Sequence, residues 1–233
     1  MKKRSVFFII CLIVLADQVL KIYIKTHYHA GESHSVLGNW FQLYFIENEG
    51  MAYGWKLGGE WGKMALTLFR LAAVIFGVFY INNIIAKKYN KGFIICVALI
   101  FAGALGNLID SMFYGLIFEE SSTITYNVAK IFPEHGYAGF LHGNVVDMLY
   151  FPIIHTQFPE WLPVWGGQNF DFFSPIFNLA DASISTGIIA IFVFQKRFLK
   201  ANPAELTDKN KNIEKNIENE TLVNDEAQIH SAQ

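Results

Sequence analysis

Residues 177–185 read Phe177-Asn178-Leu179-Ala180-Asp181-Ala182-Ser183-Ile184-Ser185 and open an apolar run that continues to Gln195. A helix rises about 1.5 Å per residue, so about 20 residues cross the roughly 30 Å of hydrocarbon in a bilayer. The run is long enough to span a membrane, yet Asp181 stands near its start. A carboxylate is costly there unless it faces a partner or a wet cavity. This stretch therefore predicts a membrane-spanning helix with a functional site at one end.

The expected partner of Asp181 is Asp147, in the upstream segment 143–151. Two carboxyls brought together in a partly dry site do not both ionise easily. One keeps a proton while the other stays charged, which provides an acid and a base for hydrolysis. Pairing of Asp147 with Asp181 is therefore the central hypothesis.

The composition indicates an integral membrane protein. Of 233 residues, 53% are hydrophobic and 16% are charged, whereas globular chains contain about 25% charged residues. Long apolar runs over 5–24, 63–86, 92–113 and 176–195 explain the difference. We expect an all-α membrane protein, a four-transmembrane-helix bundle within residues 1–200.

Basic residues predict the orientation of the bundle. They cluster before the first run, between the second and third, and after the fourth: Lys2, Lys3, Arg4, Lys87, Lys88, Lys91, Lys196, Arg197 and Lys200. By the positive-inside rule, both termini and the 87–91 link are cytoplasmic. The segments 26–62 and 114–175 then face outward.

The segments outside the apolar runs differ in character. Residues 40–46 are aromatic and β-prone and precede a turn, so we expect a small β-rich segment on the outer face. The segment 114–175 is a long, proline-containing connection. Residues 201–233 are polar and highly charged, which predicts a disordered cytoplasmic tail.

Four carboxylates share one depth in this topology. Asp17 and Asp110 lie toward the outer ends of their runs, Asp181 lies at the outer start of its run, and Asp147 lies in an outer segment. Scattered structural polar residues would have no reason to share a depth. The pattern therefore predicts a site at the outer interface.

Three polar features leave alternatives open. Asp17 and Lys21 stand at i and i+4, so they either join the site or form a self-neutralising ion pair. Arg70, inside the second run, could pair with Asp17 or Asp110 or extend outward. Asn107 and Asp110 share one helical stripe with two glycines, which permit close helix approach, and both need hydrogen-bond partners.

These residues resemble the lipoprotein signal peptidase family, also called signal peptidase II, over most of residues 10–195. Five blocks carry the resemblance, in order along the chain: Asp17-Gln18-Val19-Leu20-Lys21, Asn48-Glu49-Gly50-Met51-Ala52-Tyr53-Gly54, Gly103-Ala104-Leu105-Gly106-Asn107-Leu108-Ile109-Asp110, Val145-Val146-Asp147 and Phe177-Asn178-Leu179-Ala180-Asp181.

The resemblance implies an intramembrane aspartic endopeptidase of the bacterial inner membrane. Such an enzyme removes the signal peptide from a diacylglyceryl-modified prolipoprotein, cutting before the lipidated cysteine, without a metal or organic cofactor. We expect a monomer among membrane lipids, with no nucleic acid partner. Asp147 and Asp181 would be catalytic. The expected substrate-binding residues are Asn48, Gly50, Asn107, Asp110, Asn178, Asp17 and Arg70.

The chain departs from the family pattern at Ser111, where an arginine usually follows the aspartate of the third block. Residues 114–142 and 152–175 look like insertions. We hypothesise that Arg70 supplies the missing cation from the neighbouring span.

A proton- or ion-coupled transporter is the alternative function, because intramembrane carboxylates also mark proton paths. A path would need polar groups through the full thickness of the membrane, whereas the inner halves of the four runs are almost wholly apolar. A purely structural bundle is the third possibility, and it does not explain the shared depth of the carboxylates.

Overall fold

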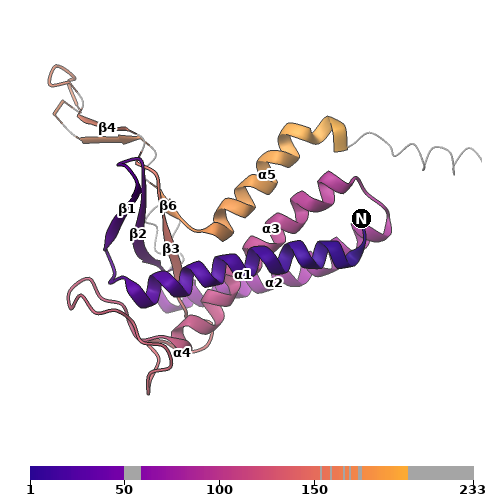
Figure 1. Ribbon diagram of the computed structural model, residues 1–233, viewed down its shortest axis with the longest axis horizontal. Helices are drawn as coiled ribbons and strands as arrows, with labels where there is room; N and C mark the ends of the chain where they lie inside the picture. Colours follow the sequence, from indigo (N-terminus) through magenta and orange to yellow (C-terminus); the bar gives the residue numbers. More distant parts are fainter. Residues whose placement is uncertain are drawn as a thin grey trace, which may run out of the picture.

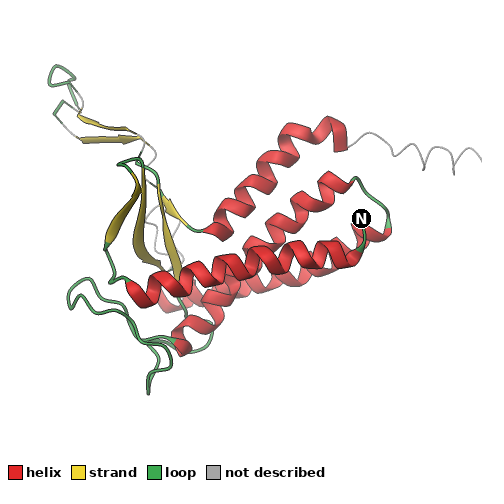
Figure 2. Ribbon diagram, viewed as in Figure 1, coloured by secondary structure: helices red, strands yellow, loops and turns green. Residues whose placement is uncertain are grey.

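In the computed structural model, four long helices run side by side and a small antiparallel sheet caps one end of them (Figures 1 and 2). The structure describes residues 1–49, 59–152, 154–157, 159–164, 166–167, 169–172 and 175–198. The long helices are α1 (Lys3–His27), α2 (Gly59–Ala86), α3 (Lys91–Ile109) and α5 (Leu179–Phe198). All four are long and apolar enough to cross a membrane, which confirms the predicted four-span bundle.

The third span does not stop at the end of α3. It continues through a π-helical turn, η1 (Asp110–Tyr114), into the short helix α4 (Gly115–Ile117). A π-turn inserts an extra residue into a helix and is often found at functional sites. Here it begins at Asp110, one of the candidate site residues.

The capping sheet has the strand order β1-β2-β3-β6 and is antiparallel throughout. Its strands are β1 (Ser33–Leu37), β2 (Phe41–Asn48), β3 (Val145–Tyr150) and β6 (Ile176–Phe177). A separate hairpin of β4 (Ile154–Gln157) and β5 (Asn169–Phe172) extends from it, away from the bundle (Figure 1). We call the end of the bundle that carries this sheet the sheet end.

The predicted β-rich segment is present as β1 and β2, but the sheet is larger than expected. Strand β3 comes from the segment 114–175, where the sequence indicated only a connection. The fourth span also begins later than predicted, because Ile176 and Phe177 pair with β3 as strand β6. The predicted tail, residues 201–233, lies outside the described residues.

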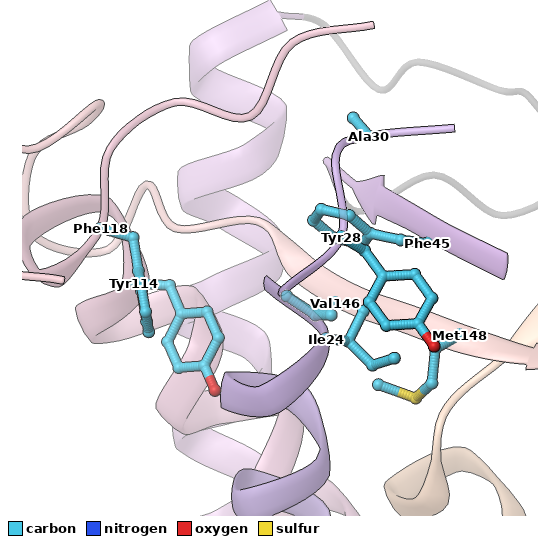
Figure 3. Packing of buried hydrophobic residues seen from close by; sticks show 8 residues of the cluster. All are labelled: Ile24, Tyr28, Ala30, Phe45, Tyr114, Phe118, Val146 and Met148. Atoms are coloured by element: carbon cyan, nitrogen blue, oxygen red, sulfur yellow. The ribbon is translucent and has the colours of Figure 1, made fainter. Parts of the chain in front are cut away.

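Two apolar clusters hold the bundle at opposite ends. At the sheet end, side chains from α1 and the residues just after it, from β2 and β3, and from the end of the third span and the residue after it pack together (Figure 3): Ile24, Tyr28, Ala30, Phe45, Tyr114, Phe118, Val146 and Met148. At the other end, Val6 packs with Ile81, Ile84, Ile94 and Ala98. The buried polar side chains of the bundle lie on its sheet-end side.

Close backbone contact joins α3 to α5. A Cβ on Gly103 would lie 2.2 Å from the carbonyl oxygen of Ala180, and one on Gly106 would lie 2.7 Å from an oxygen of Asp17. Only glycine fits at this separation. The glycines of the third run therefore permit close helix approach, as the sequence suggested, and bring α1 and α5 against the polar stripe of α3.

Candidate active site

Asn178 links the two proposed catalytic carboxyls. It precedes α5 and lies between strand β6 and the helix. Its Oδ1 accepts a hydrogen bond from the backbone N–H of Asp181 (2.8 Å), the capping contact that asparagine commonly makes at a helix start. Its Nδ2 donates to Oδ1 of Asp147 (2.6 Å). One buried side chain thus positions both aspartates.

Asp147 lies in β3 and is 2% exposed. Besides Asn178, it accepts a hydrogen bond from Nδ2 of Asn48 at the end of β2 (3.2 Å). Burial, and then the nearby negative charge of Asp181, raise the pKa of Asp147 to about 7. These two causes are those expected for one member of a carboxyl pair in a partly dry site.

Asp181 lies in the first turn of α5, where the helix dipole favours a negative charge. Its side chain is half-buried, so it is more open than Asp147. Nδ2 of Asn107 donates to Oδ1 of Asp181 (2.7 Å), and Oδ1 of Asn107 accepts from Nζ of Lys21 (2.9 Å). Because Lys21 can only donate, the orientation of the Asn107 amide is fixed.

Lys21 sits between two buried carboxylates. Its Nζ lies 2.9 Å from Oδ2 of Asp17 and 2.7 Å from Oδ2 of Asp110, and all three side chains are at most 1% exposed. Gln18 donates to Oδ1 of Asp110 (2.8 Å), and the backbone N–H of Ala180 donates to Oδ1 of Asp17 (2.9 Å). The ion pair between Asp17 and Lys21, one of the two alternatives from the sequence, is therefore present, and Asp110 pairs with the same lysine.

This ion network braces the elements that carry the site. It joins α1 to the start of η1 through Asp110 and to the start of α5 through the backbone of Ala180. The backbone N–H of Val146, in β3, also lies 3.5 Å from Oδ2 of Asp110. Removing one partner of such a buried group would leave an uncompensated charge.

Arg70 of α2 donates through Nη1 to Oγ of Ser111 (2.7 Å), and that hydroxyl donates to the carbonyl of Asn107 (2.9 Å). The two carboxylates that the sequence suggested as partners for Arg70, Asp17 and Asp110, both pair with Lys21 instead. The carboxylates within electrostatic range of the guanidinium are Asp181, Asp110 and Asp147. Arg70 thus meets the third span at Ser111.

A second polar network was not foreseen. Glu47 of β2 pairs with Nζ of Lys25, which is 0% exposed, and accepts a hydrogen bond from Nδ2 of Asn144 (2.8 Å). Asn144 in turn accepts from Lys63. The partners lie too far apart in sequence for spacing to reveal them. The signal available in the sequence was their position: Glu47 directly precedes Asn48, and Asn144 lies three residues before Asp147, and both of these neighbours belong to the family blocks.

The structure thus brings most of the predicted site residues into one cluster at the sheet end. Asn48, Asn107 and Asn178 contact the two aspartates directly. Asp17 and Asp110 lie beneath them in the ion network. Gly50 lies outside the described residues.

Comparison with known proteins identifies the family of the chain. The sequence profile of the Signal peptidase (SPase) II family matches residues 9–196. A lipoprotein signal peptidase of Porphyromonas gingivalis is 46% identical over 191 residues, 81% of each chain. That of Amoebophilus asiaticus is 35% identical over 88% of this chain and 83% of its own.

Solved structures show the same fold. A bacterial membrane enzyme with 27% sequence identity superposes with a TM-score of 0.53, covering 86% of this chain and 96% of that one. The profile match over nearly all of the membrane region, together with the identity to the two relatives, shows that the chain belongs to the signal peptidase II family.

Proposed function

We propose that the protein is an intramembrane aspartic endopeptidase that removes the signal peptide from a diacylglyceryl-modified prolipoprotein. In this proposal the cut falls before the lipidated cysteine. The observation that carries the proposal is the Asn178 side chain, which contacts Asp147 and the backbone of Asp181 at once.

Asp147 and Asp181 form the catalytic pair in this proposal. The ionised carboxylate takes a proton from a water molecule, which attacks the scissile carbonyl, while the protonated carboxyl donates to the carbonyl oxygen. The roles reverse as the amine leaves. A pKa of about 7 at Asp147 supports the pair, because it keeps a proton available near neutral pH.

The surrounding polar groups have supporting roles. Asn48, Asn107 and Asn178 hold the carboxyls and donate to the substrate backbone, and Gly50 is proposed to contact the substrate as well. Asp17 and Asp110 are positioning residues, since both pair with Lys21 in a buried network. The Arg70 guanidinium provides positive charge for the pair and the substrate carbonyls.

The transporter alternative is less consistent with the burial pattern. Among the described residues, the buried polar and charged side chains come from the sheet-end halves of the spans and from the sheet: Asp17, Lys21, Lys25, Thr67, Asn107, Asp110, Ser111, Asp147, Asn178 and Ser183. The opposite end is packed by the cluster around Val6 and Ile84. A proton path would need polar groups there as well.

The test is cleavage of a lipidated precursor by the purified protein in detergent. Asp147→Asn and Asp181→Asn keep the shape of the side chain and lose the acid–base chemistry, so each should abolish turnover while folding and membrane insertion remain. Glu134→Gln, an isosteric change at an exposed acid, is the matched control. Substantial turnover by either aspartate variant would remove that residue from the mechanism.

A further inference from the structure

We propose that a rim of apolar side chains on residues 118–140 inserts into the headgroup region of the bilayer, in the leaflet at the sheet end. This apolar rim consists of Ile124, Tyr126, Val128, Ile131, Phe132 and Phe140, all of them exposed. Ile124 and Phe132 are the extremes, at 85% and 78% exposed. The inference is independent of the catalytic pair.

The segment that carries the rim runs between the sheet-end termini of two spans (Figure 1, beside α4). Next to the third span, Phe118 pairs with Ile131, and the backbone N–H of Phe132 donates to the carbonyl of Ile117 (2.7 Å). Next to the first span, Val128 pairs with His29. The ring of Tyr126 also lies 5.1 Å from that of His29.

The rim is continuous with the apolar outer surface of the spans. Phe113 and Leu116, at the end of the third span, are 39% and 49% exposed, and the ring of Phe113 lies 5.8 Å from that of Phe140. Near the end of the first span, Ile22 and Tyr23 are exposed in the same way. Lipid that covers these helix surfaces would reach the rim without interruption.

The segment is also held in place. Lys25 of α1 donates to Oγ of Ser121 (2.9 Å), and its Nζ lies 5.5 Å and 5.0 Å from the ring centroids of Phe118 and Tyr137. These contacts hold one side of the segment against α1, so the rim lies on the side that faces away from the protein. Lys130, exposed beside Ile131, supplies the basic residue that interfacial segments commonly place among apolar ones.

A lipid surface fits this arrangement better than a protein partner. The rim contacts the ends of the first and third spans through His29 and Phe113, so a protein covering it would have to displace lipid from the adjoining helix surfaces. Aromatic and aliphatic side chains with a flanking lysine are typical of segments that lie in the interface.

The test uses spin labels on the full chain in vesicles of phosphatidylethanolamine and phosphatidylglycerol. Labels are attached at Phe132→Cys and Ile124→Cys, in a background with Cys11 and Cys96 replaced by alanine. Glu134→Cys, exposed and two residues from Phe132, is the matched control. Phe69→Cys, 70% exposed on α2, marks the lipid-facing surface of a span. Power saturation then compares collisions with oxygen and with a water-soluble nickel chelate.

We expect the oxygen-to-nickel ratio at both rim positions to exceed that at Glu134→Cys severalfold and to approach that at Phe69→Cys. Rim labels as open to the nickel chelate as Glu134→Cys would overturn the proposal. A second result would also overturn it: labels that the nickel chelate reaches in vesicles, but that neither oxygen nor the chelate reaches in native membranes. A protein partner would then cover the rim.

Discussion

At the scale of single residues, three asparagines hold the two carboxyls of the proposed catalytic pair. Asn178 and Asn48 donate to Asp147, and Asn107 donates to Asp181. A hydrogen bond to a carboxylate favours its charged form, so these contacts act against the burial that raises the pKa of Asp147. The balance between them sets where the pair loses its proton.

That balance predicts the pH dependence of cleavage. The pKa of Asp147 is raised to about 7 by burial and by the charge of Asp181. Since the mechanism needs one protonated carboxyl, kcat/KM should fall as the pH rises through about 7. Asn48→Ala removes a donor that favours the ionised form, so its falling limb should move to higher pH. A limb that stays in place or moves to lower pH would contradict this role for Asn48.

Arg70 gives a second prediction at this scale. Arg70→Leu should lower kcat/KM on the order of 10²-fold, the effect of removing one donor from a preorganised charged site. Ser111→Arg in the same chain should restore part of the activity, because Ser111 is the residue that Arg70 contacts. Precursor cleavage by the two variants is the measurement, with detergent gel filtration to follow folding. Parental activity in Arg70→Leu would disprove the hypothesis, and loss of folding would favour a structural role.

The polar partners of these residues show what sequence reasoning could reach. The Asp17–Lys21 pair lies one helical turn apart, and spacing alone suggested it. The bond between Asn144 and Glu47 joins residues 97 apart, and nothing in the local pattern of either indicates the other. Most of the predicted site residues lie in blocks that resemble a family, whereas partners such as Glu47 and Asn144 are brought together only by folding.

At the scale of elements, the site rests on strands that the sequence did not reveal. The first four residues of β3, which include Asp147, are all buried, so the strand lacks the alternation of polar and apolar residues that marks a half-exposed strand. Strand β6 is two residues long and reads as part of the apolar run that follows it. Asn178 ends the extended stretch by capping α5, which is why the helix starts at Leu179.

The close approach of α3 and α5 predicts a sharp response to one methyl group. A Cβ at Gly103 would lie 2.2 Å from the Ala180 carbonyl oxygen, so Gly103→Ala must push the helices apart and shift the start of α5. We expect a loss of about 1–3 kcal/mol in the free energy of unfolding, seen as a lower midpoint of thermal unfolding in detergent, together with reduced cleavage.

Gly77→Ala is the matched control within another span. Its Cβ would meet the ring of Phe101, a side chain that can rotate, instead of a backbone atom. The same gain in helix propensity therefore comes with a smaller penalty. Equal destabilisation by the two variants would show that the α3–α5 contact is not the cause.

At the scale of the whole molecule, the polar site and the basic clusters lie at opposite ends of one bundle. The N-terminus and the link between α2 and α3 lie far from the sheet (Figure 1). The ring of Phe198, the last residue of α5, lies 6.0 Å from that of Phe93 near the start of α3. This separation could be predicted from the sequence, because the bilayer determines both the length of the apolar runs and the side on which lysines and arginines gather.

Because the site and the basic clusters lie at opposite ends, the positive-inside rule predicts on which side of the membrane the site lies. Lysines and arginines at the end opposite the sheet predict that this end is cytoplasmic, so the sheet and the paired aspartates face outward. In a chain without Cys11 and Cys96, an impermeant maleimide added to intact cells should label His34→Cys in β1. It should label Tyr89→Cys, in the α2–α3 link, only after the membrane is opened. Both positions are exposed, so the contrast measures sidedness and not burial. Labelling of Tyr89→Cys from outside would place the aspartates on the cytoplasmic side, where a precursor already translocated across the membrane could not reach them.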